Sequence, residues 1–203
     1  MKIICVEANY AESVNSGSCG ESREPVVFMK TDSSLLKGNK PFYLPYFSKE
    51  IVGGASVVYR ISRLGKNIQE KFAHRYYDAV ALGMDLTAVD LQKQLMSEGK
   101  PWEISKAFDG SAVVSDFVSL DEFGSKDDMN FSLEVDGVEV QAGNVKDAAF
   151  SVDRIIAYVS RFFTLKIGDL IYTGTPKDSV VLTKDTKIVG KLDGRKLLDF
   201  NVK

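Results

Sequence analysis

The sequence predicts an α+β fold that is rich in β-strand, with a few short helices on its outside. Short apolar or alternating runs recur along the 203 residues, and two Asp-Gly pairs separate alternating segments in the second half. Helical spacing of apolar residues is clearest in only two segments, 87–98 and 151–163. We therefore expect strands to form the core and helices to cover it.

Short apolar runs predict buried strands, because each is bounded by turn-forming or polar residues. Residues 55–61 are the richest in β-branched side chains. The runs expected to be strands in this way are 26–29, 55–61, 80–84 and 170–172.

Two hairpins are expected in the second half. Asp136-Gly137 lies between the alternating residues 131–135 and 138–141, and Asp193-Gly194 lies between 188–192 and 197–202. Asp and Gly both tolerate the positive φ that a two-residue hairpin turn requires.

Two helices are expected. The first covers 87–98, with Thr87 as N-cap and Gly99 just after its end. The second covers 151–163, with Ser151 as N-cap. Its apolar stripe consists of Val152, Ile155, Ile156, Val159, Phe162 and Phe163.

Length and composition are those of a globular protein, and we expect one domain over 1–203. Residues 8–24 are polar and are expected to be a loop or a mobile lid. The net charge is -2 without a block of like charge, so neither nucleic acid nor an anionic membrane is an expected partner. Cys5 and Cys19 make no metal or redox motif, and as free thiols they favour a cytoplasmic location.

Six short motifs occur in order along the chain. They are Asn-Tyr-Ala-Glu at 9–12, Glu-Pro-Val-Val-Phe-Met-Lys at 24–30, Leu-Gly-Lys-Asn-Ile at 64–68, Gly-Met-Asp-Leu-Thr-Ala at 83–88, Lys-Ala-Phe-Asp at 106–109 and Thr-Gly-Thr-Pro at 173–176. In order and spacing over nearly the whole chain, these segments resemble the fumarylacetoacetate hydrolase family.

This resemblance implies a mixed β-roll with short peripheral helices, assembled as a homodimer. It also implies Mg²⁺ or Mn²⁺ held by two Glu and one Asp, and hydrolysis, decarboxylation or isomerisation of 2-oxo or β-diketo acids. The metal in such a site chelates the 2-oxo carboxylate and stabilises the enolate that forms when a C–C or C–H bond breaks.

The metal ligands that the family pattern requires are mostly missing. Asp85 matches the Asp ligand, although it could instead be an N-terminal acid for the helix near Thr87. The Glu-x-Glu pair aligns with Gly54 and Ser56, and no Asp or Glu occurs from Ile51 to Gln69. One carboxylate and a hydroxyl make a poor site for Mg²⁺. We expect no cofactor, or Mg²⁺ or Mn²⁺ if the family site is partly retained.

Other departures remove further chemistry. The lid His of hydrolytic members corresponds to Ser13, and the single histidine, His74, is expected to be a surface or capping residue. Two arginines of the pattern correspond to Val89 and Ala8, and residues 177–180 lack the glycines of the family's loop.

Four candidate site residues remain. Lys106 is the candidate catalytic residue, although the sequence favours a salt bridge with Asp85 over contact with an anionic substrate, because unpaired charges are costly in a cleft. Gln92 and Thr175 are candidate substrate-binding residues; Thr175 could instead serve the turn before Pro176, and Gln92 could face solvent. Asp85 is the candidate metal ligand.

Three hypotheses follow. In the first, the chain is a family protein with a dismantled metal and catalytic site, which binds a small carboxylate or has a structural role. In the second, it is a divergent hydrolase, isomerase or decarboxylase of a 2-oxo or β-diketo acid, so enzyme activity is left open. In the third, the small residues at 53–56 enlarge the former metal cleft for an unrelated molecule.

Overall fold

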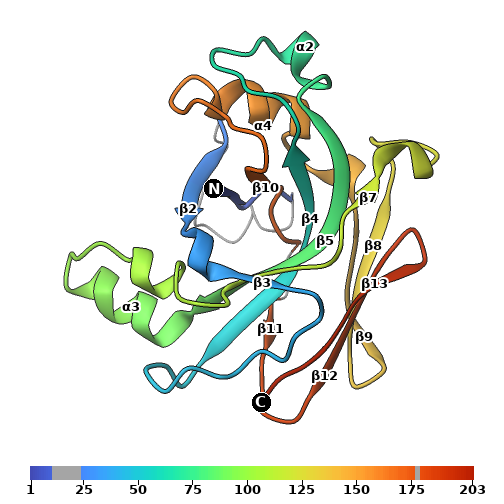
Figure 1. Cartoon of the computed structure of the whole chain (residues 1–203). Helices are drawn as coiled ribbons and strands as arrows, with labels where there is room; N and C mark the ends of the chain where they lie inside the picture. Colours follow the sequence, from blue (N-terminus) through green and yellow to red (C-terminus); the bar gives the residue numbers. More distant parts are fainter. Residues whose placement is uncertain (11–23, 177–178) are drawn as a thin grey trace.

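The structure is a computed structural model that describes residues 1–10, 24–176 and 179–203. Over these residues, nine strands form one mixed sheet and four form a second, antiparallel sheet. Helices are short and lie outside the strands (Figure 1). The expected β-rich α+β fold with peripheral helices is confirmed, and the strands of the larger sheet curl around the centre of the molecule.

The larger sheet is built around two long antiparallel strands, β4 and β5. Its order is β2-β1-β10-β4-β5-β6-β3, with β11 paired to β4 and β7 paired to β5. The β1–β10 and β3–β6 pairs are parallel, which makes the sheet mixed. Its strands are β1 (Ile3–Glu7), β2 (Val26–Lys30), β3 (Leu35–Lys37), β4 (Ile51–Ile61), β5 (Tyr77–Ala88), β6 (Ala112–Val114), β7 (Val118–Ser119), β10 (Leu170–Tyr172) and β11 (Val180–Val181).

The smaller sheet consists of the two predicted hairpins, which are both confirmed. Asp136 and Gly137 have φ of 51° and 83°, and Asp193 and Gly194 have φ of 45° and 75°. The sheet has the order β13-β12-β8-β9 and shares one hydrophobic core with β4 and β5. Its strands are β8 (Asn130–Val135), β9 (Val138–Asn144), β12 (Lys187–Leu192) and β13 (Arg195–Asn201).

The helices lie at the edges of this arrangement. Helices α2 and α4 lie together at one end of the molecule, and α3 projects from its side (Figure 1). The α-helices are α2 (Glu70–Ala73), α3 (Val89–Ser97) and α4 (Val152–Val159), and the short 3₁₀ turns are η1 (Asp32–Ser34), η2 (Glu103–Ser105), η3 (Leu120–Glu122) and η4 (Val145–Asp147).

Helix α4 begins as predicted but ends early. The Ser151 hydroxyl accepts a hydrogen bond from the Arg154 backbone N–H at 3.2 Å. The expected stripe is buried up to Val159, after which bonds between residues three apart tighten the chain and Ser160 closes the helix. Phe162 lies beyond this end and is exposed, so its predicted place in the stripe is wrong.

Helix α3 begins later than predicted. Strand β5 continues through Ala88, and Thr87 pairs with Val52 in the sheet instead of capping the helix. The cross-strand pairing with β4 outweighs the local capping preference of threonine. Gly99 has a φ of 63° just after the helix, as predicted. Asp85 is therefore a strand residue, and the alternative that it is an N-terminal acid of this helix is wrong.

Strand β2 is only half buried, contrary to the expectation of a buried strand. Val26 and Met29 are exposed, whereas Phe28 and Lys30 are buried. The reason is its position at the edge of the sheet, where it pairs only with β1 and one of its faces meets solvent. This alternation turns a lysine into the interior.

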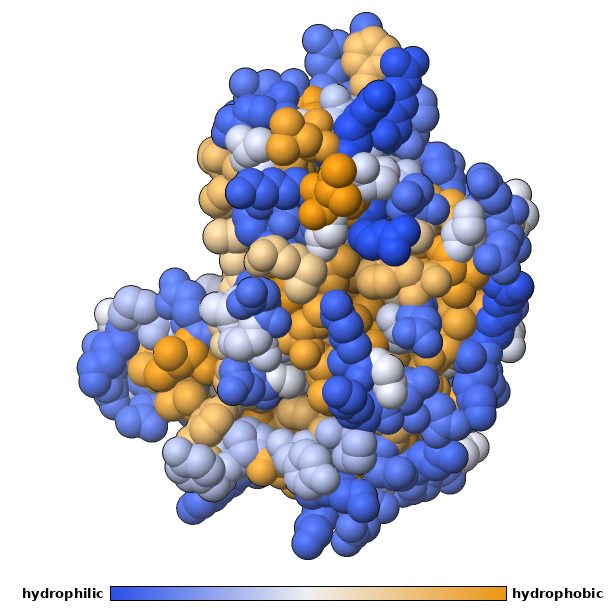
Figure 2. Space-filling view, viewed as in Figure 1, coloured by the Kyte–Doolittle hydropathy of each residue, from blue (hydrophilic) through white to orange (hydrophobic). Residues whose placement is uncertain are grey.

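The surface and the cysteines carry no feature that points to a particular function. Figure 2 shows hydrophilic side chains interspersed with apolar ones, including a small apolar patch over the α3 lobe. In the described ranges, no helix is long and apolar enough to cross a membrane. Cys5 is a free, buried thiol, and burial raises its pKa. Cys19, Ser13 and most of the expected lid at 8–24 lie outside the described residues.

Candidate functional site

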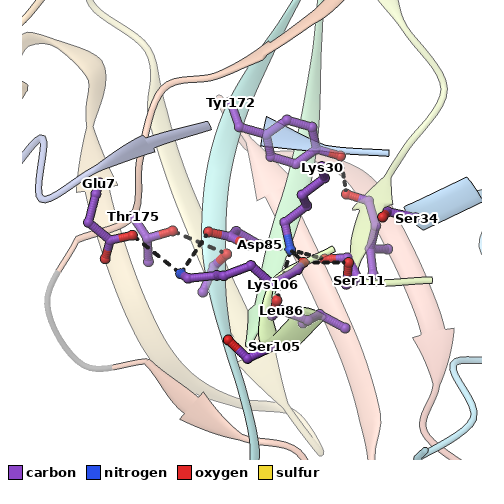
Figure 3. A network of polar contacts seen from close by, with 12 residues as sticks. Glu7, Lys30, Ser34, Asp85, Leu86, Ser105, Lys106, Ser111, Tyr172 and Thr175 are labelled. Carbon is purple, nitrogen blue, oxygen red and sulfur yellow. Dashed lines mark hydrogen bonds and ion pairs between the residues drawn. The ribbon is translucent and has the colours of Figure 1, made fainter. Parts of the chain in front are cut away.

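Asp85 lies at the centre of a cluster of four charged side chains. It projects from β5, and its carboxylate is 2.8 Å from Lys30 Nζ and 3.6 Å from Lys106 Nζ (Figure 3). Burial by itself would raise the pKa of Asp85, but the two ammonium groups outweigh burial and hold the pKa below its usual value. Asp85 is therefore an ionised carboxylate that two lysines already neutralise.

Lys30 holds this carboxylate from the interior. Its side chain is 0% exposed, and its ammonium donates hydrogen bonds to the carbonyl oxygens of Leu86 at 2.8 Å and Ser111 at 3.1 Å, and to that of Lys106. Together with Asp85, these acceptors satisfy all three protons of the ammonium group. Lys30 thus has a structural role and fixes the position of Asp85.

Lys106 reaches the same carboxylate from the other side. It follows η2, its side chain is 7% exposed, and its Nζ lies 3.3 Å from Glu7 Oε2 and 4.5 Å from the centre of the Phe28 ring. Burial alone would lower the pKa of Lys106, but Asp85 and Glu7 raise it above its usual value. The ammonium therefore stays charged, and the expected pairing with Asp85 is present.

The position opposite Asp85 has no room for a side chain. Gly54 is the cross-strand partner of Asp85, and a Cβ placed on it would lie 2.1 Å from Thr175 Cγ2 and 3.1 Å from Gln141 Nε2. Gln141 is held there because its Oε1 accepts a hydrogen bond from the Ala55 N–H at 2.7 Å. Both side chains fill the space that an acidic residue on β4 would need.

The neighbouring positions on the same face of β4 carry no acid either. Val52 and Ser56 flank Gly54 at a spacing of two residues, so they share its face. Ser56 is fully buried, and its hydroxyl has no hydrogen-bond partner among the described residues. In the described segments no three His, Cys, Asp or Glu side chains gather as a metal site would require. The residues at this position therefore do not fit Mg²⁺ or Mn²⁺.

The remaining candidates divide between the cluster and the surface. The Thr175 hydroxyl donates to the Gly54 carbonyl at 3.4 Å, so this residue adjoins Asp85. Gln92 is half-buried on α3 and makes no hydrogen bond to the charged cluster within the described residues. His74 is exposed and caps the C-terminal end of α2, as predicted.

The cleft that small residues at 53–56 were expected to enlarge is closed at Gly54 by Thr175 and Gln141.

Three residues of this site were missed by sequence reasoning: Glu7, Lys30 and Gln141. Glu7 and Lys30 each end a short apolar strand, so a charged residue at a strand end was the available signal. Gln141 is a buried polar residue in an otherwise exposed stretch of β9, and only contact between the two sheets explains it.

Comparison with known proteins identifies the family. The family described as fumarylacetoacetate (FAA) hydrolase, C-terminal, matches residues 2–194. The chain belongs to the fumarylacetoacetate hydrolase family. A mitochondrial oxaloacetate tautomerase from Mus musculus is 32% identical over 201 residues, covering 99% of this chain and 91% of the relative. An oxaloacetate tautomerase from Escherichia coli is 31% identical, covering 97% of this chain and 90% of the relative.

Solved structures of this family have the same fold. A fumarylacetoacetate hydrolase family protein from Yersinia pestis superposes with a TM-score of 0.93 at 31% identity, covering 100% of this chain and 93% of that one. Fumarylpyruvate hydrolase from Pseudomonas aeruginosa, in complex with Mn²⁺ and pyruvate, gives a TM-score of 0.92 at 29% identity, covering 100% of this chain and 89% of that one. The family backbone is therefore retained over the residues that the structure describes.

Proposed function

We propose that this chain is a fumarylacetoacetate hydrolase family protein whose metal and catalytic site has been dismantled. In place of a divalent ion, the two ammonium groups of Lys30 and Lys106 neutralise Asp85. Such a protein has a binding or structural role, and a small carboxylate is its ligand class. Metal-dependent bond cleavage or isomerisation is not part of its activity.

The observation that carries this proposal is the filled space opposite Asp85. The two metal-ligand positions on β4 correspond to Gly54, where Thr175 and Gln141 leave no room for a Cβ, and to Ser56, which has no carboxylate. Asp85 is also already paired with two ammonium groups, at 2.8 Å and 3.6 Å from its carboxylate, so its charge is balanced without a divalent ion.

Calorimetric titration with Mg²⁺ and Mn²⁺, each with and without oxalate as an enolate mimic, tests the proposal. We expect no binding up to millimolar metal. The fumarylpyruvate hydrolase from Pseudomonas aeruginosa, whose structure holds Mn²⁺, is the matched positive control. Micromolar metal affinity that strengthens with oxalate would overturn the proposal.

A second candidate function is metal-independent isomerisation of a small 2-oxo acid. The observation that favours it is the buried ammonium of Lys106 together with the oxaloacetate tautomerases among the relatives. Enolisation leaves negative charge on the 2-oxo oxygen, and an ammonium group in a dry site stabilises that charge. A spectrophotometric assay of oxaloacetate tautomerisation, with a chelator present to remove divalent metal ions, tests this candidate. Activity that survives Lys106→Ala would exclude this mechanism.

We also propose that the chain forms a homodimer, as the family resemblance implies. The backbone that the described residues share with family members supports this assembly. Light scattering coupled to size-exclusion chromatography would give a mass near twice the 22.4 kDa of one chain. A single-chain mass at micromolar concentration would contradict it.

A further inference from the structure

The carboxylate of Glu7 occupies a position that a ligand could use. Glu7 ends β1, its side chain is 50% exposed, and its Oε2 lies 3.3 Å from Lys106 Nζ. Lys106 by contrast is nearly buried between this carboxylate, Asp85 and the Phe28 ring. Figure 3 shows Glu7 reaching Lys106 from the side opposite to Lys30.

The two lysines differ in how many oxygen acceptors surround their ammonium groups. Lys30 has a carboxylate and three carbonyl oxygens for its three protons. Lys106 has one hydrogen-bonded acceptor, Glu7, and a more distant carboxylate oxygen of Asp85 at 3.6 Å, among the residues described. An ammonium group can donate three hydrogen bonds. Lys106 therefore retains capacity for a further oxygen acceptor, and Lys30 does not.

The charge of the cluster depends on Glu7. Lys30 and Lys106 contribute two positive charges, and Asp85 and Glu7 contribute two negative ones. Because Glu7 is half-exposed, it can turn into water at little cost in solvation, whereas Asp85 is only 15% exposed and held by both lysines. Without Glu7 the remaining three groups carry one net positive charge, which an added carboxylate would balance.

We propose that Glu7 is an internal competitor for Lys106: its carboxylate holds the position of a small carboxylate ligand, which binds by displacing it. This inference rests on the proposed function, because it needs Asp85 to be neutralised by lysines and not by a metal. It adds that a side chain of the protein itself occupies the ligand position, and that competition from Glu7 lowers the affinity for a carboxylate ligand.

The experiment is calorimetric titration with oxalate and pyruvate in the presence of a chelator. Glu7→Gln keeps the shape of the side chain and removes its charge, so we expect affinity to increase about five- to tenfold over the unmodified protein. Glu122→Gln is the matched control, since Glu122 is also 50% exposed and is paired with Arg195 at 3.0 Å, outside the cluster. Its affinity should equal that of the unmodified protein.

Lys106→Met in the Glu7→Gln background should remove the gained affinity, and thermal unfolding checks that this double variant is folded. If it does not fold, the ligand-induced rise in Tm of Glu7→Gln is compared with that of Glu122→Gln, and the rise should be larger for Glu7→Gln. Equal affinity of the two glutamine variants would overturn the inference, as would no carboxylate binding by either. These results are separate from the metal titration, because a chelated sample reports nothing about Mg²⁺ or Mn²⁺.

Discussion

At the scale of single residues, the space around Gly54 is the most consequential feature of the site. The methyl group of Thr175 and the amide of Gln141 meet where a side chain of β4 would have to start. A glycine is required here by close approach and not by its backbone angles, since its φ is not positive.

Substitution of Gly54 tests this contact directly. Gly54→Ala should lower the free energy of unfolding by about 1–3 kcal/mol, because the added methyl overlaps Thr175 Cγ2. Thr175→Ser removes that methyl, so Gly54→Ala should cost much less in a Thr175→Ser background. Urea unfolding of the four proteins in this cycle measures the coupling. Additive effects would mean that the two residues do not meet.

Ser56 and Ser111 form a natural comparison, since both are fully buried. The Ser111 hydroxyl donates to the Lys106 carbonyl at 2.8 Å, whereas the Ser56 hydroxyl has no partner in the described part of the chain. Ser111→Ala should destabilise by about 1 kcal/mol. Ser56→Ala should be neutral or stabilising by up to about 1 kcal/mol, because it removes an unpaired buried hydroxyl. A clearly lower Tm for Ser56→Ala than for the unmodified protein would contradict this account.

At the scale of elements, helix ends decide how the helices sit on the sheets. In α4, Ser151 supplies a side-chain cap, while α3 follows directly from β5 without one. Asp90 instead ties the start of α3 to the preceding loop, by accepting hydrogen bonds from Ser48 Oγ at 2.5 Å and the Lys49 N–H at 2.8 Å. These bonds keep the pKa of Asp90 below its usual value, against the opposing effect of desolvation.

The cap of α4 gives a prediction at this scale. Ser151→Ala should lower the free energy of unfolding by about 1 kcal/mol, because the Arg154 N–H loses its acceptor. Ser151→Thr keeps a hydroxyl at the same position and should recover most of that loss. Chemical denaturation measures both, and equal stability of the alanine and threonine variants would argue against capping.

At the scale of the whole molecule, the charged cluster joins parts of the chain that are far apart in sequence. Glu7 comes from β1, Lys30 from β2, Asp85 from β5, and Lys106 from the turn after η2. Removing one partner of a buried ion pair costs more stability than the intact pair contributes, because a buried charge is left unpaired. The four side chains therefore depend on one another.

The lowered pKa of Asp85 makes stability depend on pH. A carboxyl group with a lower pKa in the folded state stabilises the fold above its unfolded pKa of about 3.9, and this contribution is lost as pH falls through the folded-state value. Asp85→Asn should therefore destabilise the protein at pH 7 by about 3 kcal/mol, with Lys30 left without its carboxylate.

The same reasoning predicts how that difference changes. It should shrink below about pH 4, where the carboxyl group of Asp85 takes up a proton in the unfolded chain while it stays ionised in the folded one. Urea unfolding of both proteins between pH 7 and pH 3 measures it. A difference that stays constant over this range would mean that Asp85 does not interact with the lysines in its charged form.

The sequence by itself determined what depends on local pattern and on composition. Both Asp-Gly hairpins, the start of α4 and the β-rich fold class follow from turn chemistry, capping and apolar periodicity, all of which act over a few residues. The absence of acids from Ile51 to Gln69 was equally visible in the sequence, and no arrangement of β4 can supply one.

Only the tertiary structure decided which side chains meet. The partners of Asp85 and Lys106 come from separate strands, and the half-burial of β2 that turns Lys30 inward depends on its place at the sheet edge. The contact of Gln141 with β4 crosses from one sheet to the other. Such contacts are fixed by the register and packing of distant segments, and local sequence pattern carries no information about them.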